Sequence, residues 1–304
     1  MYKIKQTPED FVVKELATLD FDDKGNYSYY LMWKKEFTTQ KAVEKISRIF
    51  GIKDKFINYA GNKDKNAITE QYISINNGPK KEIETEELML KFLGKGKERI
   101  NLGDLEGNKF IITVRNIENK PKRITKIVNY FDDQRFGINK NNHVVGKLII
   151  KKKFKEAVEE IDQEAEENNY ISSLREIPKR ILRLYVHAYQ SYLWNKTVEE
   201  YIKTENKNTK IPLVGFGTEL KGKLKKIVEN LMKQEEITLR DFIIREIPEL
   251  SSEGNERDLF AEIKNLKISD LENDELNKTK KKYTISFELQ KGSYATQVIK
   301  QLFS

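Results

Sequence analysis

Residues 59–75 read YAGNKDKNAITEQYISI, and both the predicted fold and the candidate chemistry of this chain depend on them. β-forming residues lead into Ala60 and Gly61, and alternation of polar and apolar residues resumes at 71–75, which predicts two strands joined by a polar turn. Asp64 lies in that turn between Lys63 and Lys65, whose charges favour an ionised carboxylate. Such a carboxylate could act as a nucleophile, a base or a metal ligand, or the turn could be an ordinary solvated hairpin tip.

The residues before this stretch predict a strand followed by a helix. Residues 27–34 alternate, with aromatic and apolar side chains on one face and Ser28 and Lys34 on the other, which is typical of a half-buried strand. Thr38 and Thr39 offer a helix N-cap, and Gly51 provides a C-terminal stop. Residues 123–128 are interpreted as a short helix.

Patterns later in the chain predict an inserted domain. Residues 181–201 form a long amphipathic helix by their spacing, and a strand pattern returns at 283–289. A late strand that resumes an early sheet indicates an insertion inside one domain. We therefore predict a catalytic domain of residues 1–152 plus 281–304 and an insertion domain of residues 153–280.

Composition limits the classes of function. The 304 residues contain 56 Lys and Arg against 48 Asp and Glu, a net charge of +8 that favours a nucleic-acid partner, although general lysine enrichment would give the same number. No cysteine is present, which excludes disulfides and thiol nucleophiles, and the two histidines lie far apart, so no metal site is expected. With no apolar run of membrane length and no signal peptide, we expect a cytoplasmic protein without a membrane partner.

Five stretches resemble one family of RNA-modifying enzymes. AGNKDKNAITEQ (60–71) is similar to the signature of the tRNA pseudouridine synthase D (TruD) family, approximately A-G-x-K-D-x-x-A-x-T-x-Q. Four further stretches match in the family's order: PEDFVVKE (8–15), NYFDDQRFG (129–137), LRLYVHAYQSYLWN (182–195) and LQKGSYATQVIKQLF (289–303). The matches span nearly the whole chain.

The resemblance implies an α+β fold, with a mixed, mainly antiparallel-sheet pseudouridine synthase core and an inserted α/β TRUD domain. It implies a V-shaped molecule with an RNA-binding cleft. The expected activity is isomerisation of uridine to pseudouridine in tRNA, with uridine 13 of the D arm as the family's usual target and extrusion of the base from its stack. No cofactor and no metal are expected, and we expect a monomer because no heptads or large apolar face appear.

The resemblance also assigns the site residues. Asp64 matches the catalytic nucleophile, and Lys5, which precedes the PEDF motif, matches the basic residue that pairs with it. Five residues are expected to contact the uracil or the RNA: Asn129, Phe131, Gln134, Arg135 and Tyr294. Phe131 would be the aromatic platform and Asn129 its polar partner. Without the resemblance, Tyr130 and Phe131 would be read as plain core residues. Tyr294 belongs to the GSYAT turn.

One position departs from the family pattern. The family generally carries Gly where this chain has Asp132, and a Gly there could serve a positive φ or a close backbone approach. The alternative function is a non-catalytic tRNA-binding or RNA chaperone protein on the same fold. Retention of Asp64, Lys5 and Phe131 favours the enzyme, since binding alone requires no such trio.

Overall fold

The computed structural model describes residues 1–205 and 207–303, which form two compact units. Unit 1 comprises Met1–Ile127, Glu262–Ala295 and Ile299–Ser304, and unit 2 comprises Val128–Ala261 and Thr296–Val298. The middle of the chain is therefore inserted into unit 1. The domain boundaries predicted from the sequence, 152/153 and 280/281, stay a prediction, as do the V shape and the cleft.

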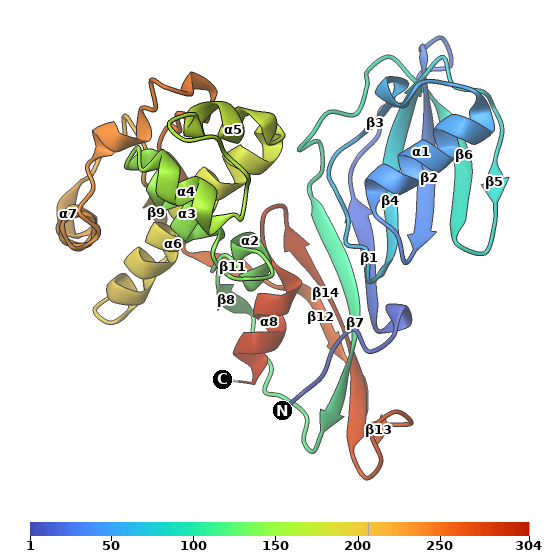
Figure 1. Cartoon of the computed structure of the whole chain (residues 1–304). Helices are drawn as coiled ribbons and strands as arrows, with labels where there is room; N and C mark the ends of the chain where they lie inside the picture. The colour runs from blue at the N-terminus through green and yellow to red at the C-terminus, as the bar shows by residue number, and fades with distance from the viewer. Residues whose placement is uncertain (206, 304) are drawn as a thin grey trace. The chain divides into compact units, whose positions relative to one another are not determined.

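Unit 1 is built on one large sheet, with strand order β12-β14-β7-β1-β4-β2-β6-β5, to which β13 adds beside β14 and β3 beside β4 (Figure 1). Its strands are β1 (Phe11–Leu16), β2 (Tyr27–Lys35), β3 (Ile57–Tyr59), β4 (Ile68–Asn76), β5 (Ile83–Glu84), β6 (Leu88–Gly96), β7 (Gly107–Ile117), β12 (Lys264–Ile268), β13 (Glu272–Asn273) and β14 (Lys281–Gln290). Among the pairings of described residues in this sheet, β1 with β4 is parallel and the others are antiparallel. The predicted mainly antiparallel α+β fold is confirmed.

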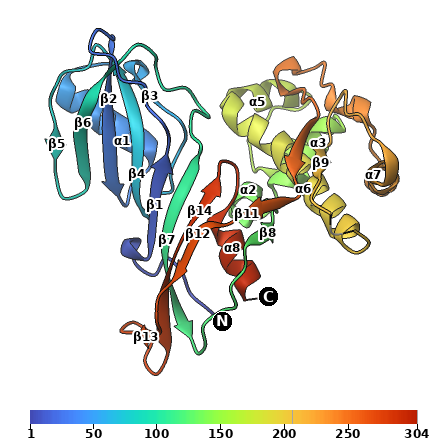
Figure 2. The same cartoon turned by 180° about the vertical axis from the view of Figure 1, so that it is seen from behind.

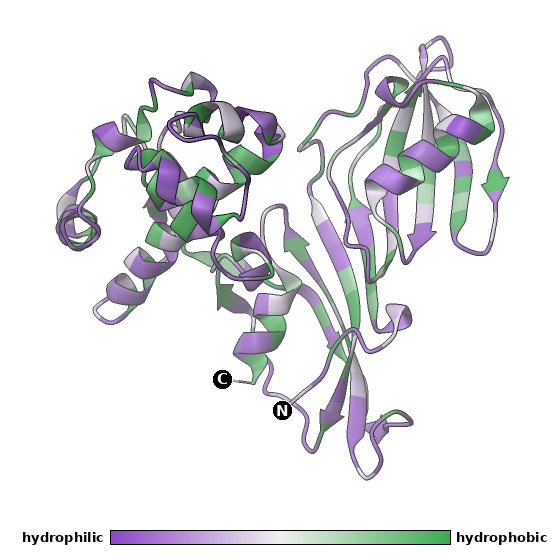
Figure 3. Ribbon diagram, in the orientation of Figure 1, coloured by the Kyte–Doolittle hydropathy of each residue, from purple (hydrophilic) through white to green (hydrophobic). Residues whose placement is uncertain are grey.

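Helix α1 (Thr39–Phe50) covers one face of this sheet, as both views show (Figures 1 and 2). It begins as predicted, because the Thr38 side chain accepts a hydrogen bond from the Lys41 N–H, and it ends at Gly51 with φ 65°. Its apolar side packs Val43 and Ile46 against the β2 and β4 side chains, while hydrophilic residues line its exposed side (Figure 3).

The predicted faces of strand β2 were wrong in one respect. Ser28 and Lys34 were expected on a solvent face, yet both are fully buried, together with Tyr30 and Met32 on the same face. The reason is tertiary, because α1 and the loop after β2 cover the face that carries them. The opposite face, with Tyr27, is the half-buried one.

Unit 2 is mainly helical. Its helices are α2 (Asp133–Phe136), α3 (Asn142–Ile150), α4 (Phe154–Glu160), α5 (Tyr170–Glu176), α6 (Lys179–Ile202) and α7 (Gly222–Glu235), joined by the strand pair β9 (Lys210–Leu213) and β10 (Asn255–Asp258). The predicted long helix is α6, whose buried side joins α3 and α7 in one apolar core. Gly146 allows α3 to approach closely, since a Cβ there would lie 2.1 Å from the Tyr185 carbonyl oxygen.

Three further elements lie at the points where the chain passes between the units: β8 (Lys126–Val128), β11 (Phe260–Glu262) and α8 (Ala295–Leu302). The predicted short helix at 123–128 is wrong, because residues from Lys126 onward form a strand. The β-branched Ile127 and Val128 suit that strand. Across residues 1–205 and 207–303, no helix has the length and apolar character that a membrane span requires.

Candidate active site

The hairpin of β3 and β4 carries Asp64 on its connecting loop. The strands pair antiparallel from Ile57 with Ile75 to Tyr59 with Ile73, as the sequence predicted. Residues 60–67 form the loop between them, and Ala60 and Ala67 at its two ends are buried. The loop is therefore anchored at both ends, while the Asp64 side chain retains 30% of its exposure.

Two buried polar residues hold the first half of this loop. Gln71 of β4 donates from Nε2 to the Gly61 carbonyl oxygen at 3.0 Å. The Thr39 hydroxyl donates to Gln71 Oε1 at 2.9 Å and accepts the backbone N–H of Lys63 at 2.9 Å. Because Thr39 and Gln71 are completely buried, these bonds are shielded from water and fix the loop backbone.

Lys63 does not face Asp64, contrary to the sequence interpretation. Its ammonium lies 2.6 Å from Glu15 Oε2 and 2.7 Å from Asn108 Oδ1, and the Lys63 and Glu15 side chains are almost fully buried. The pair ties the loop to β1 and β7. Of the two lysines that flank Asp64 in the sequence, Lys63 therefore pairs with Glu15 and not with Asp64.

The cation at Asp64 is Lys5, as the family resemblance implied. Lys5 Nζ lies 2.7 Å from Asp64 Oδ2, and it also lies 4.1 Å from the centroid of the Phe11 ring. The backbone of Lys5 has φ 56°, a conformation that non-glycine residues seldom adopt and that concentrates at functional sites. The Lys5 side chain retains 26% of its exposure, so a substrate can reach the pair.

Lys34 is a second cation beside Asp64, and sequence reasoning missed it. Its ammonium donates to the Asp64 carbonyl oxygen at 2.9 Å and to the Phe37 carbonyl oxygen at 2.6 Å. Burial lowers the pKa of Lys34 to about 8, although the charge of Asp64 opposes this shift. Lys34 thus fixes the backbone at Asp64 itself and adds positive potential beneath it.

In unit 2, Arg257 of β10 organises the Asn129–Phe131 motif. It donates from Nε to the Asn129 carbonyl oxygen at 2.9 Å and from Nη2 to Asn129 Oδ1 at 2.7 Å. Its guanidinium carbon lies 4.2 Å from the centroid of the Phe131 ring, a stacked cation–π geometry. Arg257 was not among the predicted residues, because its four-residue strand carries no motif.

Phe131 is enclosed by further groups of unit 2. The Trp194 ring meets it edge-on with centroids 5.5 Å apart, and the Arg135 guanidinium lies 5.4 Å from its centroid. Asn195 exchanges hydrogen bonds with the Phe131 backbone, accepting its N–H at 2.9 Å and donating to its carbonyl at 3.0 Å. The ring is buried, so stacking on a uracil requires a neighbouring side chain to move.

The remaining predicted residues lie at helix ends. Gln134 is exposed on α2, and Tyr294 is the half-buried N-cap residue of α8. Asp132 has φ −86°, so no positive φ is needed at the position where the family carries Gly. The Asp132 carboxylate instead accepts a hydrogen bond from Gln297 Nε2 at 2.8 Å.

The structure therefore brings Lys5 and Asp64 together in unit 1, and Asn129, Phe131 and Arg135 together in unit 2. Thr7 and Asp10 have the spacing of a capping box, a local sequence pattern that can be recognised without a structure. Lys34 and Arg257 belong to no local pattern of this kind. In the described part of the chain, no three His, Cys, Asp or Glu side chains gather as a metal site requires.

Comparison with known proteins identifies the family of this chain. The family model described as tRNA pseudouridine synthase D (TruD) matches residues 2–162, 161–209 and 196–302. A protein of Methanocaldococcus jannaschii named "Probable tRNA pseudouridine synthase D 2" is 33% identical over 99% of this chain and 91% of its own length. The tRNA pseudouridine synthase D of Aquifex aeolicus is 31% identical over 99% of this chain and 98% of its own.

A solved structure shares the fold. The crystal structure titled as a TruD protein of Methanosarcina mazei superimposes with a TM-score of 0.77 at 27% identity, and the match covers 98% of this chain and 92% of that one. The shared fold and the matches over nearly the full chain define the class of pseudouridine synthases. Within that class, the chain belongs to the tRNA pseudouridine synthase D (TruD) family.

Proposed function

We propose that this protein isomerises uridine to pseudouridine in tRNA, with Asp64 as the nucleophile and Lys5 as the cation that keeps it ionised. The contact of 2.7 Å between Lys5 Nζ and Asp64 Oδ2, on a loop fixed from several sides, supports this assignment. An opposite charge at this distance favours the carboxylate over the acid. The names of the relatives in this family support tRNA as the substrate.

The reaction needs no external electrons and no co-substrate. The bond between uracil N1 and ribose C1′ breaks, the uracil turns, and a new bond forms between C5 and C1′. C5 loses a proton and N1 gains one, so the product is an isomer of the substrate. Asp64 would act at the first stage, by adding to the ribose, by adding to the ring or by removing a proton.

The base must leave its stack to reach Asp64, because a paired base hides its reacting atoms. Phe131 and Asn129 are the proposed uracil contacts, with Arg135, Gln134 and Tyr294 toward the RNA. The guanidinium groups of Arg135 and Arg257 both lie over the Phe131 ring. Because Arg257 is held by its hydrogen bond to Asn129, the Arg135 side chain is the one that would have to move before a base could stack on the ring. The proposed target is uridine 13 of the D arm, and the protein would act as a cytoplasmic monomer without a cofactor or metal.

The test is pseudouridine mapping on an unmodified tRNA transcript incubated with the wild-type protein. Carbodiimide treatment followed by primer extension should give a stop at uridine 13. A transcript with cytidine at position 13 is the matched substrate control and should give no stop there. A stop at another uridine would retain the enzyme and correct the target.

The non-catalytic alternative gives a different result. An RNA-binding or chaperone protein would bind the transcript and leave every uridine unmodified. Binding without product, for several different tRNA transcripts, would therefore reject the proposed activity.

A further inference from the structure

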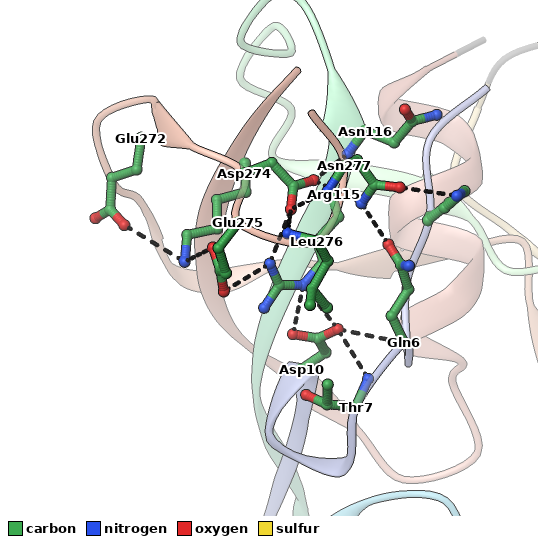
Figure 4. Close-up of polar contacts among 12 residues, drawn as sticks. Gln6, Thr7, Asp10, Arg115, Asn116, Glu272, Asp274, Glu275, Leu276 and Asn277 are labelled. Carbon is green, nitrogen blue, oxygen red and sulfur yellow. Dashed lines mark hydrogen bonds and ion pairs between the residues drawn. The ribbon is translucent and has the colours of Figure 1, made fainter. Parts of the chain in front are cut away.

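The strained backbone at Lys5 needs groups that hold it, and those groups lie on both sides of it in the chain. Before it, Lys3 pairs with Arg115 of β7 through two backbone hydrogen bonds of 2.9 and 2.8 Å. After it, the backbone N–H groups of Gln6 and Thr7 both donate to Asp10 Oδ2, at 3.1 and 3.2 Å. The segment that carries Lys5 is thus fixed at both ends. Figure 4 shows the end at Gln6, Thr7 and Asp10.

One guanidinium connects these supports. Arg115 donates from Nε to Asp10 at 2.9 Å, and its Nη1 lies 3.0 Å from Asp274 Oδ1 and 2.9 Å from Glu275 Oε1. Arg115, Asp10 and Asp274 are all nearly fully buried. The same residue therefore holds the N-terminal segment by its backbone. It also holds the segment by its side chain, through Asp10 (Figure 4).

Asp274 brings the turn between β13 and β14 into the same cluster. Burial opposes its ionisation, but hydrogen bonds from the backbone N–H of Asn116, the Asn277 side chain and the backbone N–H of Leu276 outweigh it and lower the pKa of Asp274 to about 2. Asn277, also in this turn, donates to Gln6 Oε1 at 2.7 Å and accepts from Lys3 Nζ at 2.8 Å. The turn thus contacts residues on both sides of Lys5.

Stability alone is a weak explanation for this cluster. A buried ion network gains little over apolar side chains of similar volume, because each charge must first be removed from water. What such a network provides is one defined geometry, since a buried charge tolerates few alternative arrangements. The geometry defined here is that of the segment 3–7, whose one side chain at the candidate active site is Lys5.

We propose that Arg115 is a positioning residue for the candidate active site, which holds the segment 3–7 through Asp10, and with it Lys5, at hydrogen-bond distance from Asp64. Asp274 contributes by binding Nη1 of the Arg115 guanidinium, while Asp10 binds Nε. This inference rests on the proposed function, because it assigns Arg115 a part in the same reaction. Arg115 itself does not touch the substrate.

The first test needs no activity. Lysine acetylation by a dilute reagent, quantified residue by residue by mass spectrometry, reports how firmly each ammonium is held. Arg115→Lys keeps the charge but not the planar fork, and it should increase the acetylation rate of Lys5 about tenfold. Lys14 is the internal control, because its ion pair with Glu70 at 2.7 Å lies outside the cluster and should react at the wild-type rate.

The second test is kinetic. If Lys5 is displaced by about 1 Å, kcat should fall on the order of 100-fold while KM for tRNA stays within about twofold. The acid limb of the pH–rate profile should also move to higher pH, because the Asp64 carboxylate takes up a proton more readily when Lys5 is displaced from it. Lys34 would remain as the other cation near Asp64. Asp274→Asn, which preserves shape, should give a smaller change in the same direction, and it serves as the test variant if Arg115→Lys does not fold.

A stability control separates positioning from loss of fold. Ile46→Ala removes apolar volume from the buried side of α1. It should lower the melting temperature without moving the pH–rate profile or the acetylation of Lys5. If Arg115→Lys and Asp274→Asn behave like Ile46→Ala, the cluster is only structural and the inference is wrong. If the wild type makes no pseudouridine, the proposed function fails instead, and the acetylation result still decides whether Arg115 holds Lys5.

Discussion

The ammonium of Lys34 lies 2.9 Å from the backbone carbonyl oxygen of Asp64, although the Lys34 side chain is completely buried beneath α1. A cation inside the fold thus fixes the main chain of the candidate nucleophile from below, while Lys5 contacts its carboxylate. The two lysines have different environments, and they lead to different predictions.

Lys34 should make stability depend on alkaline pH. Its pKa is lowered to about 8 in the fold from 10.5, so between these values the folded chain has released a proton that the unfolded chain retains. The unfolded state binds more protons there, and the free energy of unfolding should therefore rise with pH. Relative to Lys34→Met, the wild type should gain roughly 3 kcal/mol between pH 7.5 and 10.5. Urea unfolding of both proteins across this range measures the difference, and parallel pH curves would contradict it.

Lys5→Met should abolish most of the activity while leaving tRNA binding intact. The substitution removes the ammonium at 2.7 Å from Asp64 but retains the length of the side chain. We expect kcat to fall about 100-fold or more, as is usual when a group that sets the geometry and ionisation of a catalytic residue is lost. Lys14→Met is the matched control, since it removes a lysine paired with Glu70 on the neighbouring strands. Equal activities of the two variants would refute the role of Lys5.

Lys63→Met should destabilise unit 1 strongly, because it leaves the carboxylate of Glu15 buried and without its cation. The expected loss is about 3–5 kcal/mol of unfolding free energy. The double variant Lys63→Met, Glu15→Gln removes both charges and should recover most of that loss. Chemical denaturation of the single and double variants gives the coupling energy, and additive losses would show that the pair is not coupled.

Arg257→Lys should impair the motif of unit 2 that we propose contacts the uracil. Lysine cannot reproduce the two hydrogen bonds to Asn129 or the planar stacking on Phe131. Loss of these charge-assisted contacts should lower kcat/KM for tRNA roughly tenfold or more. Arg183→Lys is the control, since Arg183 makes one exposed hydrogen bond to the Glu249 carbonyl oxygen in the same unit. If Arg257→Lys has the same kcat/KM as the wild type, Arg257 does not contribute to the candidate active site.

The sequence was sufficient for features that depend on neighbouring residues. The hairpin around Asp64 and the caps of α1 follow from alternation, turn residues and N-cap chemistry over a few positions. The contact of Lys5 with Asp64 spans 59 positions, and only the resemblance to a family indicated it. Local patterns and family motifs therefore predicted the fold class and the central pair.

The rest could not be predicted because it depends on which side chains meet in three dimensions. Arg115 and Asp274 are 159 positions apart, and each would be an ordinary charged residue in its local sequence. Lys34 follows the alternation of a solvent face, and only the packing of α1 reverses that assignment. Buried charges of this kind break the hydrophobic pattern from which burial is normally inferred.

The alignment with one relative is longer than this chain. The alignment with the Methanocaldococcus jannaschii relative spans 395 positions, more than the 304 residues of this chain, so the relative has segments that this chain lacks. The family match restarts near residues 161 and 196, both within unit 2.

The most direct measurement compares wild type with Asp64→Asn on the same unmodified tRNA transcript, with binding measured alongside product. Asparagine preserves the shape of the side chain but has no charge and is a poor nucleophile. We predict pseudouridine from the wild type, no detectable product from Asp64→Asn, and equal tRNA affinity for both proteins. Product from Asp64→Asn at the wild-type rate would show that Asp64 is not the catalytic group.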